Sequence, residues 1–316
     1  MYAAHLQHST SPVTFMGPKR YSQPPCNISD LPHSIIVLSH NHYDHTDLSA
    51  LQAIWQQQRS HQIPTHFFVP LGMRAWMLNN LPGTTEKEVH ELDWWQGRQV
   101  GDLMIYCTPA QHGSARTPTD KDVCLWSSWT FRHIHKGKET TCFFAGDTGY
   151  RSVPLANATP LNPPSPFPGD DQLKSLPTNP IFAHLGEKFS GFDLALLPIG
   201  LFNPINFMST VHSSPWDSVD ISIDLKARKS IAMHYGTCVL FSLCSSRIAP
   251  DKVSSVRGGL SANYEPIDVP LKELKAACER KGLAHGKADE VQSEGQGEFV
   301  FCDIGQTVCV KGRQVG

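Results

Sequence analysis

Short hydrophobic runs alternate with amphipathic stretches along most of the chain. Seven runs rich in β-branched and aromatic residues, each bounded by turn residues, predict β-strands at 34–38, 66–70, 103–108, 123–131, 141–146, 193–198 and 230–234. Four segments place apolar residues close to helical spacing and predict helices at 47–58, 71–81, 216–227 and 270–283. This alternation indicates an α/β fold in which helices cover much of each sheet.

Two stretches interrupt the pattern. Residues 151–180 are rich in Pro, Asn and Ser, and residues 239–264 show no clear periodicity. We interpret both as loops or insertions in a single domain spanning 16–316, and leave 1–15 as an unassigned N-terminal segment. The longest apolar runs are much shorter than the ~20 residues that cross a bilayer, so we expect any membrane contact to be peripheral.

Composition narrows the class of protein further. The 316 residues are 40% hydrophobic and 18% charged, which is enough to build a globular core. A formal net charge of −2 gives no electrostatic case for binding nucleic acid. Nine cysteines without a CxxC pair, and no readable targeting peptide, favour reduced thiols in an intracellular, cytoplasmic protein, with the organelle left open.

The sequence HNHYDHTD, residues 40–47, is the most informative stretch for function. It places three histidines and two aspartates directly after a predicted strand, at the end where α/β folds hold ligands. A tight turn can direct a His-x-His pair to one metal ion and an Asp-His pair to a second. The alternative is a solvated polar turn that binds no metal.

Three further ligand-type residues stand at the ends of predicted strands: His112, Asp147 and His234. One such residue alone is usually an ordinary hydrogen-bonded side chain. Three of them, added to the 40–47 loop, favour a metal centre. Asp47 is most simply the N-cap of the helix that follows. The histidines without convergent spacing are assigned no role; they are His61, His66, His90, His133, His135 and His184.

The order of these residues resembles the metallo-β-lactamase superfamily, which implies an αβ/βα sandwich with a dinuclear zinc site. Further motifs, including MGPKRY (16–21), FVPLGM (68–73), FFAGDTGY (143–150) and MHYGT (233–237), resemble the N-acyl phosphatidylethanolamine-hydrolysing phospholipase D family within it. The likeness covers about residues 16–237. Because only 39 residues precede the metal loop, we expect the first sheet to be incomplete at its N-terminal side.

The resemblance implies two zinc ions per chain. It assigns one zinc to His40, His42 and His112, the other to Asp44, His45 and His234, and the bridging position to Asp147. Such a site generates a nucleophile at neutral pH, because zinc lowers the pKa of bound water. His212 is assigned to catalysis and substrate binding, either by holding a phosphoryl oxygen or by protonating the leaving alkoxide. A loop histidine without a role is the alternative. Tyr43 is assigned to substrate binding.

The reaction implied by the resemblance is zinc-dependent hydrolysis of an N-acylated phosphatidylethanolamine by attack of metal-bound hydroxide on phosphorus. The products are an N-acylethanolamine and phosphatidic acid. The expected partners are this phospholipid, a membrane surface contacted peripherally, and a second copy in a homodimer. Two alternatives remain open: a dinuclear zinc hydrolase of another substrate, such as a lactone or a phosphorylated sugar, and an inactive shortened homologue.

Overall fold

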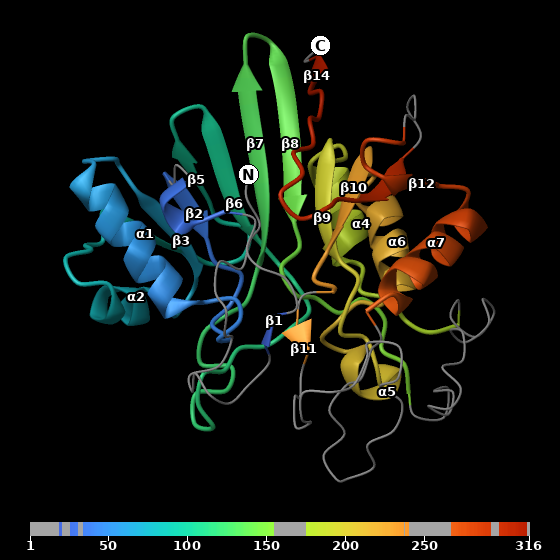
Figure 1. The fold of residues 1–316 in the computed structure, drawn as a ribbon, viewed down its shortest axis with the longest axis horizontal. Helices are drawn as coiled ribbons and strands as arrows, with labels where there is room; N and C mark the ends of the chain where they lie inside the picture. The colour runs from blue at the N-terminus through green and yellow to red at the C-terminus, as the bar shows by residue number, and fades with distance from the viewer. Residues whose placement is uncertain are drawn as a thin grey trace.

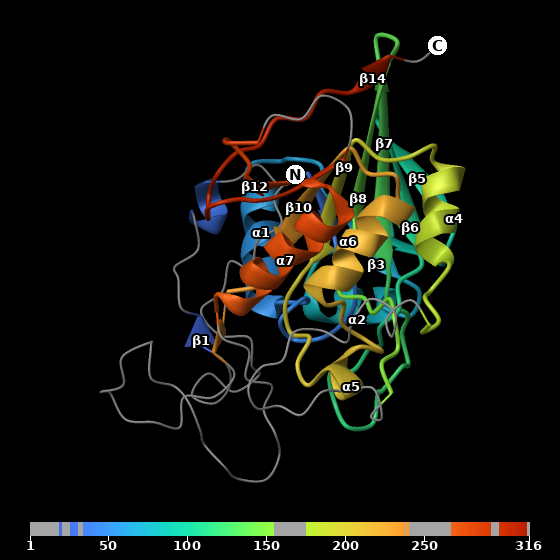
Figure 2. The same cartoon turned by 90° about the vertical axis from the view of Figure 1, so that its right-hand side faces the viewer.

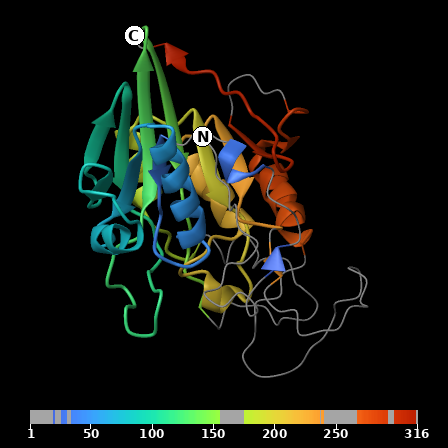
Figure 3. The same cartoon turned by 60° about the vertical axis from the view of Figure 1, so that its left-hand side comes forward.

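The computed structural model describes residues 19–20, 26–30, 34–154, 175–236, 238–239, 267–291 and 297–314. Two β-sheets lie face to face, and helices cover the outer face of each (Figure 1). Figure 2 looks onto the helices that cover the second sheet, and Figure 3 brings the helices that cover the first sheet forward. Most of the predicted insertions, residues 155–174 and 240–264, lie outside the described residues. The ends of the first are joined by an antiparallel bridge between Arg151 and Thr178.

The first sheet is parallel and has three strands in the described chain. Successive side chains of its β3 strand point to opposite faces of the sheet, and both faces are buried. Phe67 packs against the outer helices, whereas Phe68 faces the second sheet. β2 pairs with β3 alone in the described part of the chain. The expected incompleteness of this sheet depends on residues 1–33, most of which lie outside the described residues. The elements of this half are β2 (Ile35–Val37), α1 (Leu48–Ser60), β3 (His66–Pro70), α2 (Arg74–Asn80) and β4 (Val89–Leu92).

The second sheet has nine strands of mixed direction within the described residues. Antiparallel hairpins join β5 to β8, after which β8, β9, β10, β13 and β12 run parallel, and β14 adds antiparallel to β8. The strands are β5 (Gly97–Val100), β6 (Leu103–Thr108), β7 (Ser128–His135), β8 (Lys138–Phe144), β9 (Leu194–Pro198), β10 (Lys229–Met233), β12 (Ala284–Lys287), β13 (Glu298–Phe301) and β14 (Arg313–Gln314).

In the part of the chain that the structure describes, three helices cover the outer face of the second sheet. Phe182, Val219 and Leu274, one from each helix, pack in a single buried cluster with Phe143 of β8. The helices are α4 (Ile181–Lys188), α6 (Pro215–Asp224) and α7 (Val269–Lys281), and short elements complete the chain: η1 (Ile28–Asp30), α5 (Ile205–Met208) and a β1 (Lys19–Arg20) to β11 (Cys238–Val239) pair.

All the predicted helices form, with shifted ends, and six of the seven predicted strands are close to their expected bounds. The exception is 123–131, where the strand begins at Ser128, because the preceding residues form a loop whose Leu125 N–H donates to Leu71. Within the described ranges, none of the helices combines the length and the apolar composition needed to cross a membrane.

A pair of histidines joins β3 to β4 inside the first half. His66 Nδ1 and His90 Nε2 are 2.8 Å apart, and His90 is only 2% exposed beneath Phe68. Burial, together with the charge of Arg98, lowers the pKa of His90 to about 4. His90 is therefore neutral in the folded protein at pH values where an unfolded histidine, with a pKa of about 6.5, already binds a proton.

This difference predicts a loss of stability in mild acid. As the pH falls from about 6.5 towards 4, the unfolded chain binds a proton at this position and the folded chain does not, so the free energy of unfolding decreases. His90→Phe removes that proton uptake. We expect the variant to lose less stability than the wild type between pH 7 and pH 5 in urea unfolding, while His61→Phe at the exposed end of α1 behaves as wild type. Equal pH dependence in all three proteins would contradict the assignment.

Candidate metal centre

The 40–47 loop leaves β2 and enters α1 through a tight turn. His45 and Thr46 both donate their backbone N–H to the carbonyl of His42, at 3.1 and 2.8 Å. Asp47 caps the helix by accepting from the N–H of Ala50 at 3.0 Å, as predicted. Thr46 Oγ1 donates to the carbonyl of His40 at 2.6 Å. These bonds fix the backbone, so that the imidazoles project from a rigid loop.

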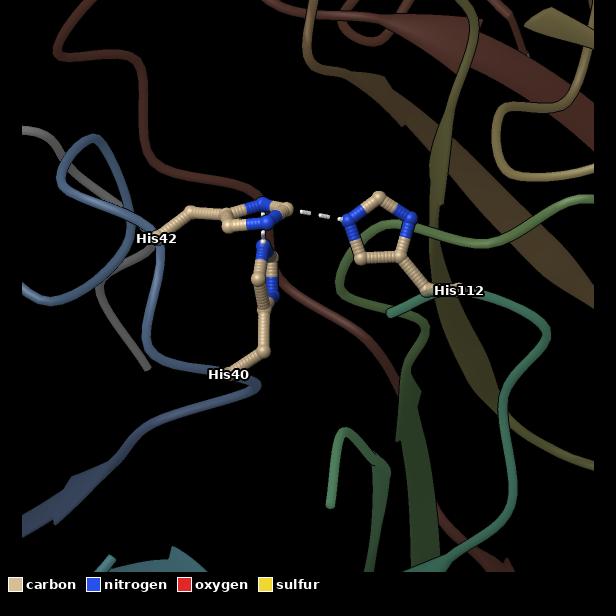
Figure 4. A group of neighbouring side chains, drawn as sticks. All are labelled: His40, His42 and His112. Atoms are coloured by element: carbon tan, nitrogen blue, oxygen red, sulfur yellow. Dashed lines mark hydrogen bonds between the residues drawn. The ribbon is translucent and has the colours of Figure 1, made fainter. Parts of the chain in front are cut away.

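Three imidazoles converge on one side of this loop. His40 Nε2 lies 2.9 Å from His42 Nδ1, which in turn lies 3.4 Å from His112 Nε2 (Figure 4). The far nitrogens of two rings have partners of their own: Ser39 Oγ is 3.0 Å from His40 Nδ1, and His112 Nδ1 donates to the carbonyl of Val211 at 2.8 Å. Such outer contacts orient a ligand ring. The near nitrogens can therefore hold a single cation.

A second group forms beside the first. Asp44, His45 and His234 each place a ligand atom within 4.8 Å of the other two. His45 Nε2 is 3.4 Å from Asp44 Oδ2. His234 follows β10 with a φ of +59°, and its carbonyl faces Gly200 so closely that a Cβ at position 200 would collide with it. The glycine thus permits the turn that brings His234 to the centre.

Asp147 lies between the two groups. Its Oδ2 is 3.0 Å from His45 Nε2 and 3.8 Å from His112 Nε2, and its Oδ1 is 3.1 Å from His234 Nε2. The side chain is buried, with 4% of the residue exposed. One carboxylate therefore faces ligands of both groups, which is the geometry of a bridging ligand.

The charges of the centre suit divalent cations. Burial alone would raise the pKa of Asp147, but the neighbouring charges of His234 and His45 hold it well below its usual range. Burial also lowers the pKa of His40 and of His112, which keeps both rings neutral and able to bind a metal. Against the effect of burial, Asp147 raises the pKa of His45 and of His234, so a metal that binds these two rings must displace their protons. Among the described residues, the buried atom His212 Nδ1 has no hydrogen-bond partner. Buried polar atoms left in this way fit a metal site.

His212 belongs to the same centre. Its ring lies 5.1 Å from that of His112 and 5.6 Å from that of His234, and its Nδ1 is 3.8 Å from Asp147 Oδ2. Burial lowers its pKa to about 3, so the ring is neutral at physiological pH. With His112 and Asp147 it forms a further trio able to hold a cation. The structure thus adds an eighth ligand-type side chain to the seven predicted ones.

Sequence reasoning missed Arg116. Its Nη1 donates to the carbonyls of Asn41 and Thr46, both at 2.9 Å, and so ties the metal loop to the segment that follows His112. The guanidinium lies 4.1 Å from the Tyr43 ring centre and 4.6 Å from that of Trp76. Tyr43 is therefore packed against Arg116 at the edge of the loop.

Removing Arg116 should weaken metal binding more than it weakens the fold. Partners that orient metal ligands contribute about 10- to 100-fold to affinity, and we expect Arg116→Ala to lower the affinity for a divalent metal ion within that range. Arg116→Lys keeps the charge but not the planar fork, so it should restore only part of the loss. Chelator competition measures the affinity, with Arg59→Ala, which removes an arginine stacked on Trp55, as control. An unchanged affinity in Arg116→Ala would refute the role.

The chain is similar to known proteins over most of its length. Residues 9–158 match the Beta-lactamase superfamily domain. This match, the layered fold and the order of the ligand-type residues show that the chain has the metallo-β-lactamase fold.

Within that class, the chain is 34% identical over 231 residues to N-acyl-phosphatidylethanolamine-hydrolyzing phospholipase D 1 of Caenorhabditis elegans, covering 71% of this chain and 55% of that protein. It is also 34% identical over 246 residues to the mitochondrial N-acyl-phosphatidylethanolamine-hydrolyzing phospholipase D of Saccharomyces cerevisiae, covering 76% and 43%. The chain spans about half the length of these relatives. Among solved structures, CmlA, a diiron β-hydroxylase from Streptomyces venezuelae, superposes with a TM-score of 0.48 at 14% identity, covering 91% of this chain and 46% of that one.

Proposed function

We propose that this chain is a zinc-dependent phospholipase D that hydrolyses N-acyl phosphatidylethanolamine to an N-acylethanolamine and phosphatidic acid. The observation that carries the proposal is the convergence of six ligand-type side chains, from three separate segments, on Asp147. The similarity to two phospholipases that act on this lipid supports the choice of substrate.

In this proposal, His40, His42 and His112 hold one zinc ion, Asp44, His45 and His234 hold the other, and Asp147 is shared. When bound, two divalent cations supply a water activated at neutral pH and a clamp for the oxygens of a phosphodiester. The protein contributes rigidity: Ser39, Val211 and the 40–47 backbone keep the imidazoles in place before substrate arrives.

His212 is proposed to bind the phosphoryl group of the substrate. A neutral imidazole donates a hydrogen bond from one nitrogen, and burial keeps this ring neutral at pH 7. A neutral imidazole is also a poor source of a proton for the leaving alkoxide. Of the two roles suggested from the sequence, binding a phosphoryl oxygen and protonating the alkoxide, we therefore favour binding. Tyr43, held against Arg116 beside the metal ligands, is proposed to contact the substrate at the rim.

The end of the molecule that carries the centre also carries exposed apolar side chains. Phe207 of α5 is 71% exposed, and Val123, in the segment between β6 and β7, is 73% exposed. Both α5 and that segment project at the same end in Figures 1 and 2. Aromatic and aliphatic side chains at one end suit shallow insertion into a lipid interface. We therefore propose peripheral contact with a membrane inside the cell, with the phospholipid headgroup directed towards the centre.

The test is hydrolysis by the full chain loaded with zinc. N-palmitoyl phosphatidylethanolamine is presented in mixed micelles, and the reaction is run in ¹⁸O-labelled water. We expect release of N-palmitoylethanolamine and of phosphatidic acid that carries the label, because attack at phosphorus places the water oxygen on the phosphate. Parallel assays use a lactone, an aryl ester and a sugar phosphate.

Each alternative has a distinct outcome. Label in the ethanolamide would show attack at carbon and overturn the mechanism. Turnover of a lactone or a sugar phosphate without turnover of the lipid would show a hydrolase with another substrate. A zinc-loaded chain that turns over nothing in the panel would support an inactive homologue.

A further inference from the structure

A second group of metal-ligand side chains lies outside the centre. Asp102, in the turn between β5 and β6, meets His133 and His135 of β7, and the three ligand atoms lie within 4.8 Å of one another. Asp102 Oδ2 is 3.7 Å from His135 Nδ1. The two imidazoles are nearly parallel, with ring centres 5.9 Å apart and an interplanar angle of 10°. Neither histidine was assigned a role from the sequence.

Strand geometry explains the convergence. Alternate side chains of a strand share one face, so His133 and His135 continue the row begun by Trp129 and Phe131, which pack between the sheets. The β7 and β8 hairpin extends beyond the first sheet, as Figures 1 and 3 show, so the row leaves the core at this point. Leu103 pairs with His133, which places Asp102 beside the histidines.

This group is remote from the metal centre. β7 begins next to it, because the N–H of Ser127 donates to the carbonyl of Ser39 at 2.8 Å. His133 and His135 lie at the other end of an eight-residue strand. At ~3.3 Å per residue, the strand separates the two groups by roughly 20–25 Å. A cation bound at one group is too far away to share ligands with the other.

We propose that Asp102, His133 and His135 form a separate surface site for one Zn²⁺ or a similar borderline divalent cation. Zinc is held by imidazole nitrogens and carboxylate oxygens at about 2.0–2.2 Å, so three ligand atoms need mutual separations of roughly 3–4 Å. Exposed side chains reach that spacing from the present one by small rotations. Water would complete the tetrahedron. Lys136 and Lys138 flank the hairpin turn and oppose the cation, so this site binds more weakly than a buried centre.

A cation here would tie the β5–β6 turn to the tip of the β7–β8 hairpin. Ligands that bind the folded state alone raise its stability in proportion to the logarithm of their concentration over Kd. Zinc added beyond saturation of the centre should therefore raise the thermal midpoint further, and this second rise should depend on the two histidines.

The experiment compares the full chain with variants in which the metal centre is intact. Equilibrium dialysis against Zn²⁺ measures the number of ions bound per chain, beginning from protein already saturated at its tighter sites. We expect wild type to bind one more ion than the double variant His133→Gln, His135→Gln. Asp102→Asn should retain the site and weaken it by at least about tenfold, as judged from the loss of one charged ligand. His61→Gln and His184→Gln serve as controls for surface histidines.

Two outcomes overturn the proposal. One is equal stoichiometry and equal affinity in wild type, the double variant and Asp102→Asn. The other is a similar loss of bound zinc in the control variants, which would indicate scattered binding to surface histidines. Circular dichroism confirms that each variant is folded, and hydrolytic turnover should be unchanged in the double variant, since neither histidine touches the centre.

Discussion

Replacing Asp147 with asparagine is expected to abolish hydrolysis while leaving most of the fold intact. The amide has almost the same shape as the carboxylate but has no charge, and one of its two oxygens is lost as a ligand. Asp147 faces His45, His112 and His234 at 3.0, 3.8 and 3.1 Å, so the change weakens both groups at once. Outer partners of metal ligands contribute about 10- to 100-fold to affinity or activity, and a shared ligand should contribute at least the upper value.

The measurement is steady-state turnover together with bound metal. Asp147→Asn should lose at least ~10²-fold in kcat and bind less zinc, whereas the exposed Asp289→Asn should match wild type in both. Folding is followed separately by urea unfolding of the zinc-free proteins. There the variant should still unfold cooperatively but with a lower free energy of unfolding, because, against the cost of burial, the charges of His234 and His45 favour the ionised carboxylate that the amide replaces. Full activity in Asp147→Asn would refute the bridging assignment.

The sequence predicted those elements whose hydrophobic period is strong. Helices α1, α2, α6 and α7 each bury an apolar face against a sheet, and their spacing reveals it. The hydrophobic pattern did not predict strands β4 (VHEL) and β5 (GRQV). In both strands, polar side chains occupy positions at which a half-buried strand normally carries apolar ones. In β4, the buried position is filled by His90, whose burial depends on His66 of another strand. Such a pairing has no signature in a single sequence.

The candidate site was predictable to the extent that its ligands occupy strand ends. The loop after β2 and the residues after β6, β8 and β10 all lie at the carboxyl ends of strands, so topology alone brings them together. Arg116 was not predictable, because it binds backbone carbonyls and aromatic faces, and these partners are set by the loop conformation. For the surface site formed by Asp102, His133 and His135, the sequence contains only the two-residue spacing of the histidines. Asp102 comes close to them through the pairing of β6 with β7, which the sequence does not reveal.

Asp193 joins three parts of the second sheet at the end opposite the metal centre. It is fully buried, and its Oδ1 accepts from Arg228 Nη1 at 2.9 Å and lies 3.3 Å from Arg313 Nε. Its Oδ2 accepts from the N–H of Thr141 at 2.9 Å. Through these contacts, the start of β9 is bonded to β8 and to the C-terminal strand β14.

Asp193→Ala is expected to lower the free energy of unfolding by about 3 kcal/mol. Breaking a buried ion pair costs ~3–5 kcal/mol, and the lower value applies because both arginines reach solvent. Asp193→Asn keeps an acceptor for the Thr141 N–H and should cost less, so the difference between the two variants isolates the hydrogen bond. Urea unfolding at fixed zinc concentration gives the free energies of unfolding, and a double-mutant cycle with Arg228→Ala gives the interaction energy between Asp193 and Arg228.

Because the metal centre lies at the other end of the sheet from Asp193, kcat of the folded variants should be unchanged. A loss of less than about 1 kcal/mol in Asp193→Ala would show that these contacts do not hold the C-terminal strand in place.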